Sequence, residues 1–237
     1  MVDTKHTFQI SGIKNREIKG MLLHGIHQLG GKYVGGSTWK AGTTHLIVSR
    51  PLASEKLLAA CAGGNWIVKP EYVLDSVRNG SWLPEESYEL DLAARSPGVA
   101  NPIRVWREMV ASCSVFGAFQ DWSVSLLVDD GNRSDMFKRI LCSGKASIFC
   151  STSASHHPVT HVFTDHVSKG LISHNAPCYS MVHIAQHLFG SFWSELGFTI
   201  QKSATLSWKH VQSWRPMNCS LLTLKINLET TFQNSRA

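Results

Sequence analysis

The stretch GGNWIVKPEYVLDS, residues 63–76 of the 237-residue chain, decides the fold. Its Gly-Gly pair is typical of a helix end, because glycine adopts the left-handed conformation found there at little cost. The apolar triplet at 66–68 predicts a short buried strand. Pro70 fits the first turn of a following helix, where no backbone amide partner is needed, and Asn79-Gly80 ends that helix. A strand between two helices indicates an α/β fold.

The residues before this stretch continue the alternation. Asn15 can cap a helix that Gly30-Gly31 ends, and Ser54 can cap a second helix over 55–62. The first helix has its apolar residues at helical spacing, namely Ile18, Met21 or Leu22, Ile26 and Leu29. Strands are predicted over 8–10, 32–34 and 44–49. The order β-α-β-β-α-β-α predicts a small, largely parallel sheet with helices on both faces.

The same landmarks recur later in the chain, which indicates an internal repeat. In order, the strand at 8–10 is echoed at 122–128, Gly31-Lys32 at Gly144-Lys145, Thr44-His45 at Thr160-His161, and Pro70-Glu71-Tyr72 at Pro177-Cys178-Tyr179. The last interval is shorter in the second copy, so we expect that copy to lack the second helix. The fold class predicted is α/β: two three-layer α/β/α repeats with small parallel sheets, the second degenerate.

Composition excludes several classes of protein. With 43% hydrophobic and 17% charged residues, the chain can bury a core, so extensive disorder is excluded. No apolar run approaches the roughly 20 residues that cross a bilayer, and the polar start at residues 1–7 shows no secretory signal. The six cysteines form no Cys-x-x-Cys pair, which favours a reducing compartment. The net charge of +6 is spread along the chain, which argues weakly against a dedicated nucleic-acid face.

These landmarks together resemble the BRCT domain, a phosphoprotein-binding module of DNA-damage signalling. The resemblance implies a first repeat at 1–90, a linker with a short helix at 91–120, a degenerate second repeat at 121–190 and a tail of unknown structure at 191–237. Within the tail, 221–232 alternates like a strand. We therefore expect a tandem BRCT chain.

Three segments, at 56–62, 104–108 and 117–119, resemble more specifically a subgroup of the family that serves a chromosome-maintenance complex. The resemblance implies a non-enzymatic adaptor without a cofactor. It implies a phosphoserine or phosphothreonine protein as partner, for which a RING-type ubiquitin ligase of post-replication repair is the candidate, and the chromosome-maintenance complex as an indirect partner. It also implies a nuclear location, with centrosomal or cytoplasmic pools known in the family.

The family's phosphate-binding residues map onto Ser11, Gly12 and Lys56. The family uses a hydroxyl residue and the next amide after its first strand, with a lysine at the start of the second helix. The physical chemistry agrees, because the first turn of a helix favours anions and disfavours a lone cation. Phosphate would accept charge-assisted hydrogen bonds from all three. Lys14, Arg16 and Thr43 are the candidates for flanking contacts.

Two departures from the family pattern limit what the site implies. Ala53 stands where related modules place an arginine that reads the +3 residue of the peptide, so the +3 preference stays open. In the second repeat, Val128-Asp129-Asp130-Gly131 replaces Ser-Gly, and two carboxylates would repel phosphate. We expect the second repeat to support the first and to shape a groove for residues beyond the phosphate.

Other interpretations stay open. Ser11-Gly12 could be a simple strand-ending turn and Lys56 a solvated surface charge. For the phosphate site, we predict that Lys56→Glu abolishes phosphopeptide binding and leaves thermal stability nearly unchanged, because an exposed lysine contributes little to folding. The alternative function is binding of DNA ends or poly(ADP-ribose). A metal site is not expected, because His183 and His187, although spaced for one helix face, have no third ligand close in sequence. His45 and His161 are expected to be structural, and Cys61 to be a small core residue.

Overall fold

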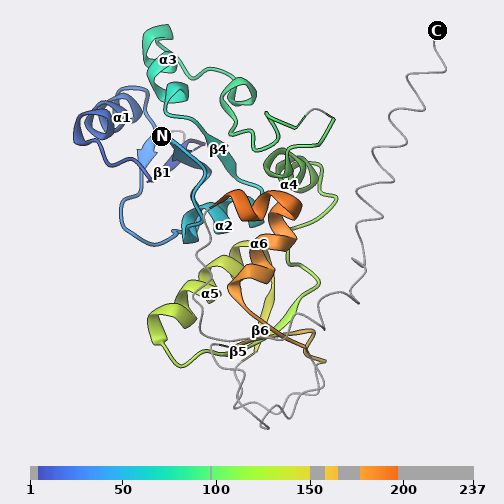
Figure 1. The fold of residues 1–237 in the computed structure, drawn as a ribbon. Coiled ribbons are helices and arrows are strands. Elements are labelled where there is room, and N and C mark those ends of the chain that lie inside the picture. Colours follow the sequence, from blue (N-terminus) through green and yellow to red (C-terminus); the bar gives the residue numbers. More distant parts are fainter. Residues whose placement is uncertain (1–4, 97, 150–157, 165–176, 197–237) are drawn as a thin grey trace, which may run out of the picture. The chain divides into compact units, whose positions relative to one another are not determined.

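Four parallel strands form the sheet of the first repeat in the computed structural model, which describes residues 5–96, 98–149, 158–164 and 177–196 (Figure 1). The strands lie in the order β2-β1-β3-β4. They are β1 (Thr7–Ser11), β2 (Lys32–Tyr33), β3 (His45–Val48) and β4 (Trp66–Val68). The two central strands, β1 and β3, are buried along nearly their whole length, because both faces of the sheet are covered.

Helices cover both faces of this sheet. They are α1 (Arg16–Gln28), α2 (Glu55–Ala62) and α3 (Glu71–Asn79). Successive strand residues point to opposite faces, so Ile47 packs with Leu22 and Tyr72 under α1 and α3, while Leu46 packs with Leu57 under α2. The predicted caps are present: the Asn15 side chain accepts from the amides of residues 17 and 18, at 2.8 and 3.2 Å. The predicted element order and the three layers are confirmed.

The second repeat has the same topology, with a parallel sheet in the order β6-β5-β7-β8. Its strands are β5 (Ser123–Leu127), β6 (Ser147–Phe149), β7 (His161–Thr164) and β8 (Cys178–Tyr179), and its helices are α5 (Gly131–Ser143) and α6 (Met181–Phe189). A 3-10 helix, η2 (Gly190–Leu196), follows. The predicted loss of a helix falls on 165–176, and the predicted strand in the tail on 221–232; both lie outside the described residues.

The repeated Thr-His pair has the same geometry in both sheets. The Thr44 Oγ1 accepts the Thr7 amide at 2.9 Å and lies 2.7 Å from the His45 Nδ1. In the second repeat, the Thr160 Oγ1 accepts the Ser123 amide at 2.9 Å and lies 2.8 Å from the Nδ1 of the next histidine. The pair therefore ties the start of the third strand to the start of the first, which is a structural role.

η1 (Glu85–Tyr88) lies at the end of the first repeat, and the segment between the repeats contains α4 (Pro102–Ala111). The Glu89 side chain is fully buried and accepts from two guanidinium groups, Arg104 at 3.0 Å and Arg107 at 2.6 Å. The Trp106 indole donates to the Leu188 carbonyl oxygen of α6 at 3.0 Å. These contacts fix the segment against both repeats. No described helix has the length and apolar character that crossing a membrane requires.

Helix α2 is the element at which the two repeats meet. Seven of its residues, from Lys56 to Ala62, are buried, because α5 and α6 of the second repeat cover the face that the first sheet leaves open. The Ser143 hydroxyl donates to the Ala59 carbonyl oxygen at 2.7 Å, and the Arg139 guanidinium contacts both Glu55 carboxylate oxygens at 2.6 and 3.0 Å. The helix that carries the predicted phosphate-binding lysine is therefore held from both sides.

Candidate phosphate-binding site

The first part of the candidate site is the turn that ends β1. Ser11 is the last residue of the strand and is half-buried, and Gly12 is exposed with φ of 71°. Glycine adopts this left-handed conformation without the steric cost that a side chain would add. The Ser49 hydroxyl donates to the Gly12 carbonyl oxygen at 3.2 Å. The turn is thus held while Gly12 itself stays exposed.

The second part is the first turn of α2. The Ser54 hydroxyl caps the helix by accepting the Leu57 amide at 3.2 Å, and it lies 3.4 Å from the Ser11 hydroxyl. The Lys56 ammonium donates to the Ile10 carbonyl oxygen at 3.0 Å and to the Gly36 carbonyl oxygen at 2.7 Å. Since residue 10 directly precedes Ser11, the structure brings the three predicted residues together.

The burial of Lys56 differs from the sequence-based expectation. The lysine is only 7% exposed, so the expectation of an exposed side chain was wrong. Helix periodicity does not reveal this, because the ammonium is held by the carbonyl oxygens of Ile10 and Gly36, which lie outside α2. A buried ammonium with two carbonyl partners takes part in the local fold, so its replacement is also a change in stability.

The electrostatics of the site favour an anion. Among the described residues, no carboxylate pairs with Lys56, since the neighbouring Glu55 accepts instead from Arg139 and from the Trp39 amide. Burial, followed by the charge of Lys19, lowers the pKa of the Lys56 ammonium. An ammonium has three hydrogens and two of them are used by carbonyl oxygens, so one donor remains for a ligand. A phosphate group would supply the missing counter-charge.

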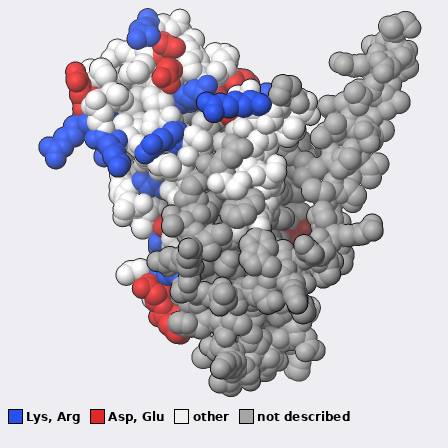
Figure 2. Space-filling view, in the orientation of Figure 1, with Lys and Arg blue, Asp and Glu red and all other residues white. Residues whose placement is uncertain are grey.

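The predicted flanking residues lie at different ends of the sheet. Lys14 and Arg16 are exposed in the turn and first helical residues after β1. Thr43 is 2% exposed at the opposite end, where its hydroxyl donates to the Lys40 carbonyl oxygen at 2.8 Å and lies 3.3 Å from the Gln9 side-chain oxygen. Sequence reasoning missed Lys19, although its spacing from Arg16 places both on one face of α1. Lys and Arg side chains gather over the first repeat, with Asp and Glu among them (Figure 2).

A groove of about 530 Å³ adjoins this site. Ser37, which follows the carbonyl that Lys56 binds, is among its lining residues. The other side belongs to α5, so both repeats contribute. The charged lining residues are Glu55, Asp130, Arg133, Asp135 and Arg139, and Met136 adds an apolar surface.

Two parts of the chain match known protein families. Residues 5–77 match the family model described as "BRCA1 C Terminus (BRCT) domain", and residues 116–201 match "TopBP1/SLF1, BRCT domain". The chain belongs to the BRCT family. Its two BRCT domains correspond to the two sheets described above, and the predicted family resemblance is confirmed.

Curated relatives match most of the chain. The chain is 34% identical over 193 residues to human "SMC5-SMC6 complex localization factor protein 1" and 32% identical over 194 residues to its mouse counterpart, covering 78% of this chain in each case. It spans 18% of the length of these relatives. Among solved structures, the "S. pombe Brc1 BRCT5-BRCT6 domains" match with a TM-score of 0.45 and 15% identity, over 62% of this chain and 66% of that one.

The second BRCT repeat has different chemistry at the equivalent turn. By strand register, Leu127 and Val128 stand where the first repeat presents Ser11 and Gly12. Asp130 caps α5 by accepting the Arg133 amide at 2.8 Å, as Asn15 caps α1. No lysine of the described residues takes the place of Lys56 in this repeat. The predicted difference between the two turns is therefore visible in the structure.

The two histidines of α6 pack against neighbouring groups and form no metal site among the residues that the structure describes. The His183 ring stacks on Tyr179 at 3.8 Å between centroids, and the His187 Nε2 lies 2.9 Å from the Ala118 carbonyl oxygen. Burial lowers the pKa of His161 and of His183 to about 4. Within the described part of the chain, this pair acquires no third metal ligand. Cys61 is fully buried, and burial raises the pKa of its thiol, which suits a core residue and not a nucleophile.

Proposed function

We propose that this chain is a phosphopeptide-binding adaptor of the DNA-damage response. Its first BRCT repeat would bind a phosphoserine or phosphothreonine side chain, and the bound protein would bring a chromosome-maintenance complex to the lesion. The chain would act by binding and not by catalysis. Its place of action would be the nucleus.

One observation carries the proposal: a buried Lys56 ammonium, without a carboxylate partner among the described residues, lies beside the Ser11–Gly12 turn. A phosphate placed there would accept from the Ser11 hydroxyl, from the Gly12 amide and from the third ammonium hydrogen. Its charge of nearly −2 at neutral pH would offset the cost of burying the cation. A neutral serine offers none of this compensation, so the site would require phosphorylation.

The second repeat would support the first rather than bind phosphate. Arg139 holds the Glu55 carboxylate by two hydrogen bonds, so a competing negative charge is kept in an ion pair beside the site. The groove lined by Glu55 and α5 would receive peptide residues that flank the phosphate. We therefore propose a phosphate-binding first repeat at 1–90, a linker at 91–120, a supporting second repeat at 121–190 and a tail at 191–237.

The partner is proposed from the relatives. The human and mouse proteins are named as localization factors of the SMC5-SMC6 complex, and they match most of this chain, which contains two BRCT domains. We propose the corresponding complex as the indirect partner. A phosphorylated RING-type ubiquitin ligase of post-replication repair is the direct partner proposed.

Paired phosphorylated and unphosphorylated peptide libraries test this function. The wild-type chain should retain phosphorylated peptides only, and Ser11→Ala and Lys56→Met should lose them. Lys69→Met removes another lysine, one that is exposed, and should bind like the wild type. Capture that ignores phosphorylation would contradict the proposal. Retention of DNA ends or poly(ADP-ribose) by both lysine variants, without phosphopeptide binding, would support the alternative function.

A further inference from the structure

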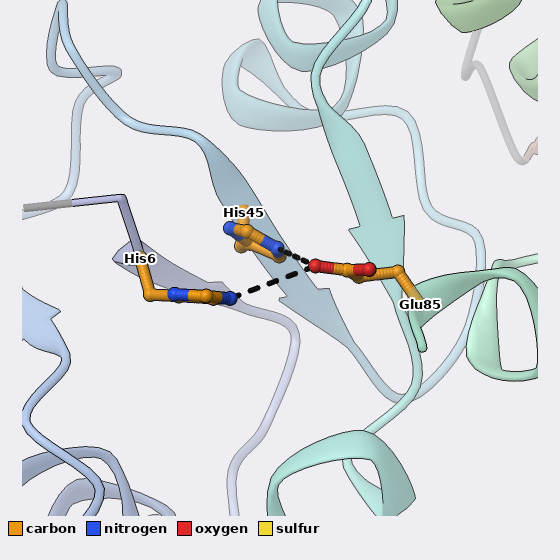
Figure 3. A group of neighbouring side chains, drawn as sticks. All are labelled: His6, His45 and Glu85. Atoms are coloured by element: carbon orange, nitrogen blue, oxygen red, sulfur yellow. Dashed lines mark hydrogen bonds and ion pairs between the residues drawn. The ribbon is translucent and has the colours of Figure 1, made fainter. Parts of the chain in front are cut away.

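Three potential metal ligands converge at the other end of the first sheet. His6 directly precedes β1, His45 begins β3 and Glu85 begins η1, so their closeness is a product of the fold (Figure 3). The His45 Nε2 lies 3.3 Å from the Glu85 Oε1, and the His6 Nε2 lies 3.6 Å from the same oxygen. One ligand atom from each residue falls within 4.8 Å of the others.

These separations suit a zinc ion. Zn²⁺ binds histidine nitrogen and carboxylate oxygen at about 2.0–2.2 Å, and tetrahedral geometry then places ligand atoms about 3.3–3.5 Å apart. The two observed N···O distances, 3.3 and 3.6 Å, are close to that spacing. The two imidazole rings are stacked, with centroids 5.0 Å apart and 25° between their planes, so an ion would bind at their Nε2 edges once the carboxylate turns aside and the rings rotate to face it (Figure 3).

A second layer of hydrogen bonds orients two of the ligands. The Thr44 hydroxyl lies 2.7 Å from the His45 Nδ1, and the Tyr72 hydroxyl donates to the Glu85 Oε1 at 3.3 Å. Metal-bound histidines and carboxylates usually have such partners, which fix the ring tautomer and the ligand direction. The His45 Nε2 donates to the Glu85 carboxylate in the metal-free chain, and metal binding would move the proton to Nδ1, facing Thr44, which frees the Nε2 lone pair.

The second repeat shows what the Thr-His pair does without these additions. Trp122 there precedes the first strand at the position of His6, and its ring stacks on His161 at 3.9 Å between centroids. Within the part of the chain that the structure describes, no carboxylate pairs with His161. The ligands in the first repeat are thus additional to a structural pair that forms without them.

The cluster is enclosed but open to a small ion. The side chains of His6, His45 and Glu85 are 14%, 3% and 20% exposed.

We propose that His6, His45 and Glu85 form a Zn²⁺ site with water as the fourth ligand. The ion would join the residue before β1, the start of β3 and the start of η1. It would thereby fasten the chain before the first strand to the sheet and to the segment that follows α3. Its role would be structural, and it is independent of the phosphate site.

Titration of the metal-free chain with Co²⁺ and Zn²⁺ tests the site, because tetrahedral Co²⁺ absorbs visible light. His6→Phe and Glu85→Gln are the diagnostic variants. The first keeps an aromatic ring to stack on Trp82, as His6 does at 4.8 Å. His27→Phe alters an exposed histidine of α1 and is the matched control. Wild type and control should bind one equivalent more than either diagnostic variant, or bind it at least about tenfold more tightly.

Thermal melting gives a second readout. Zn²⁺ should raise the melting temperature of wild type and of His27→Phe, and it should raise that of His6→Phe and Glu85→Gln less or not at all. Circular dichroism of the metal-free variants establishes that they are folded. Equal stoichiometry and affinity in all four proteins, or a wild type that binds no metal at micromolar concentrations, would overturn the site.

Discussion

The Lys56 ammonium lies 3.0 Å from the carbonyl oxygen of Ile10, the residue that precedes the Ser11–Gly12 turn. The contact joins the first helix turn of α2 to the end of β1. It places a buried positive charge next to the Ser11 hydroxyl and the exposed Gly12. The lysine therefore serves both the local fold and the proposed phosphate site.

Lys56→Glu should destabilise the protein, contrary to what an exposed lysine would imply. A carboxylate would face the carbonyl oxygens of Ile10 and Gly36, both acceptors, and lose two hydrogen bonds. We expect a loss of at least about 2 kcal/mol in the free energy of unfolding, measured with denaturant. Lys56→Met should lose less, since it adds no charge. A Lys56→Glu variant as stable as Lys69→Met would show that the lysine is not buried.

The Glu55–Arg139 pair should couple the two BRCT repeats. The guanidinium makes two hydrogen bonds, and the carboxylate side chain is only 12% exposed. A double-mutant cycle of Glu55→Gln and Arg139→Met should give a coupling free energy of about 1–3 kcal/mol. Lys138→Met breaks an exposed pair with Asp135 and should cost less than about 1 kcal/mol. Coupling near zero would mean that the repeats do not depend on this contact.

Gly64 should not tolerate a side chain. It has φ of 66°, and an added Cβ would lie 2.6 Å from the Val110 Cβ of α4. Gly64→Ala should therefore lower the free energy of unfolding by about 2 kcal/mol or more. Gly20→Ala is the control, because it lies within α1 with open space around it and should stabilise by about 0.5–1 kcal/mol. Equal effects would refute the close approach of α4 to the end of α2.

Acid should destabilise the second repeat through its buried histidines. Burial lowers the pKa of His161 and His183 from 6.5 to about 4, so the unfolded chain binds more protons between these values. Their contribution to stability is complete above about pH 6.5 and is lost as the pH falls toward 4. The melting temperature of the wild type should fall over this pH range. The melting temperature of His183→Phe should fall less steeply. Identical pH profiles would exclude this histidine as a cause.

Much of the first repeat could be predicted from sequence because its signals are local. The cap at Asn15, the glycine pairs and the period-two strands each act within a few residues, and they place Ser11 and Lys56 on the right elements. The burial of Lys56 could not be predicted, since its ammonium is held by the carbonyl oxygens of Ile10 and Gly36, 46 and 20 residues away in the chain. The same applies to Arg139, whose partner Glu55 lies 84 residues earlier.

The proposed metal ligands could not be predicted from the sequence. His6, His45 and Glu85 carry no common spacing, and only the parallel pairing of β1 with β3 and the path of the chain after α3 bring them together. Sequence spacing instead drew attention to His183 and His187, which pack against aromatic rings and a carbonyl oxygen. Ligand spacing is informative within one helix or loop and uninformative across a sheet.

The most direct test of the phosphate site is a nuclear magnetic resonance titration of the ¹⁵N-labelled chain with a short phosphoserine peptide and its serine counterpart. The account predicts that the phosphorylated peptide shifts the amide signals of Ser11 and Gly12 in the wild type, and that these shifts disappear in Lys56→Met. The serine peptide should shift neither signal. Phosphate-dependent shifts that leave this turn unaffected, or that persist in Lys56→Met, would contradict the account.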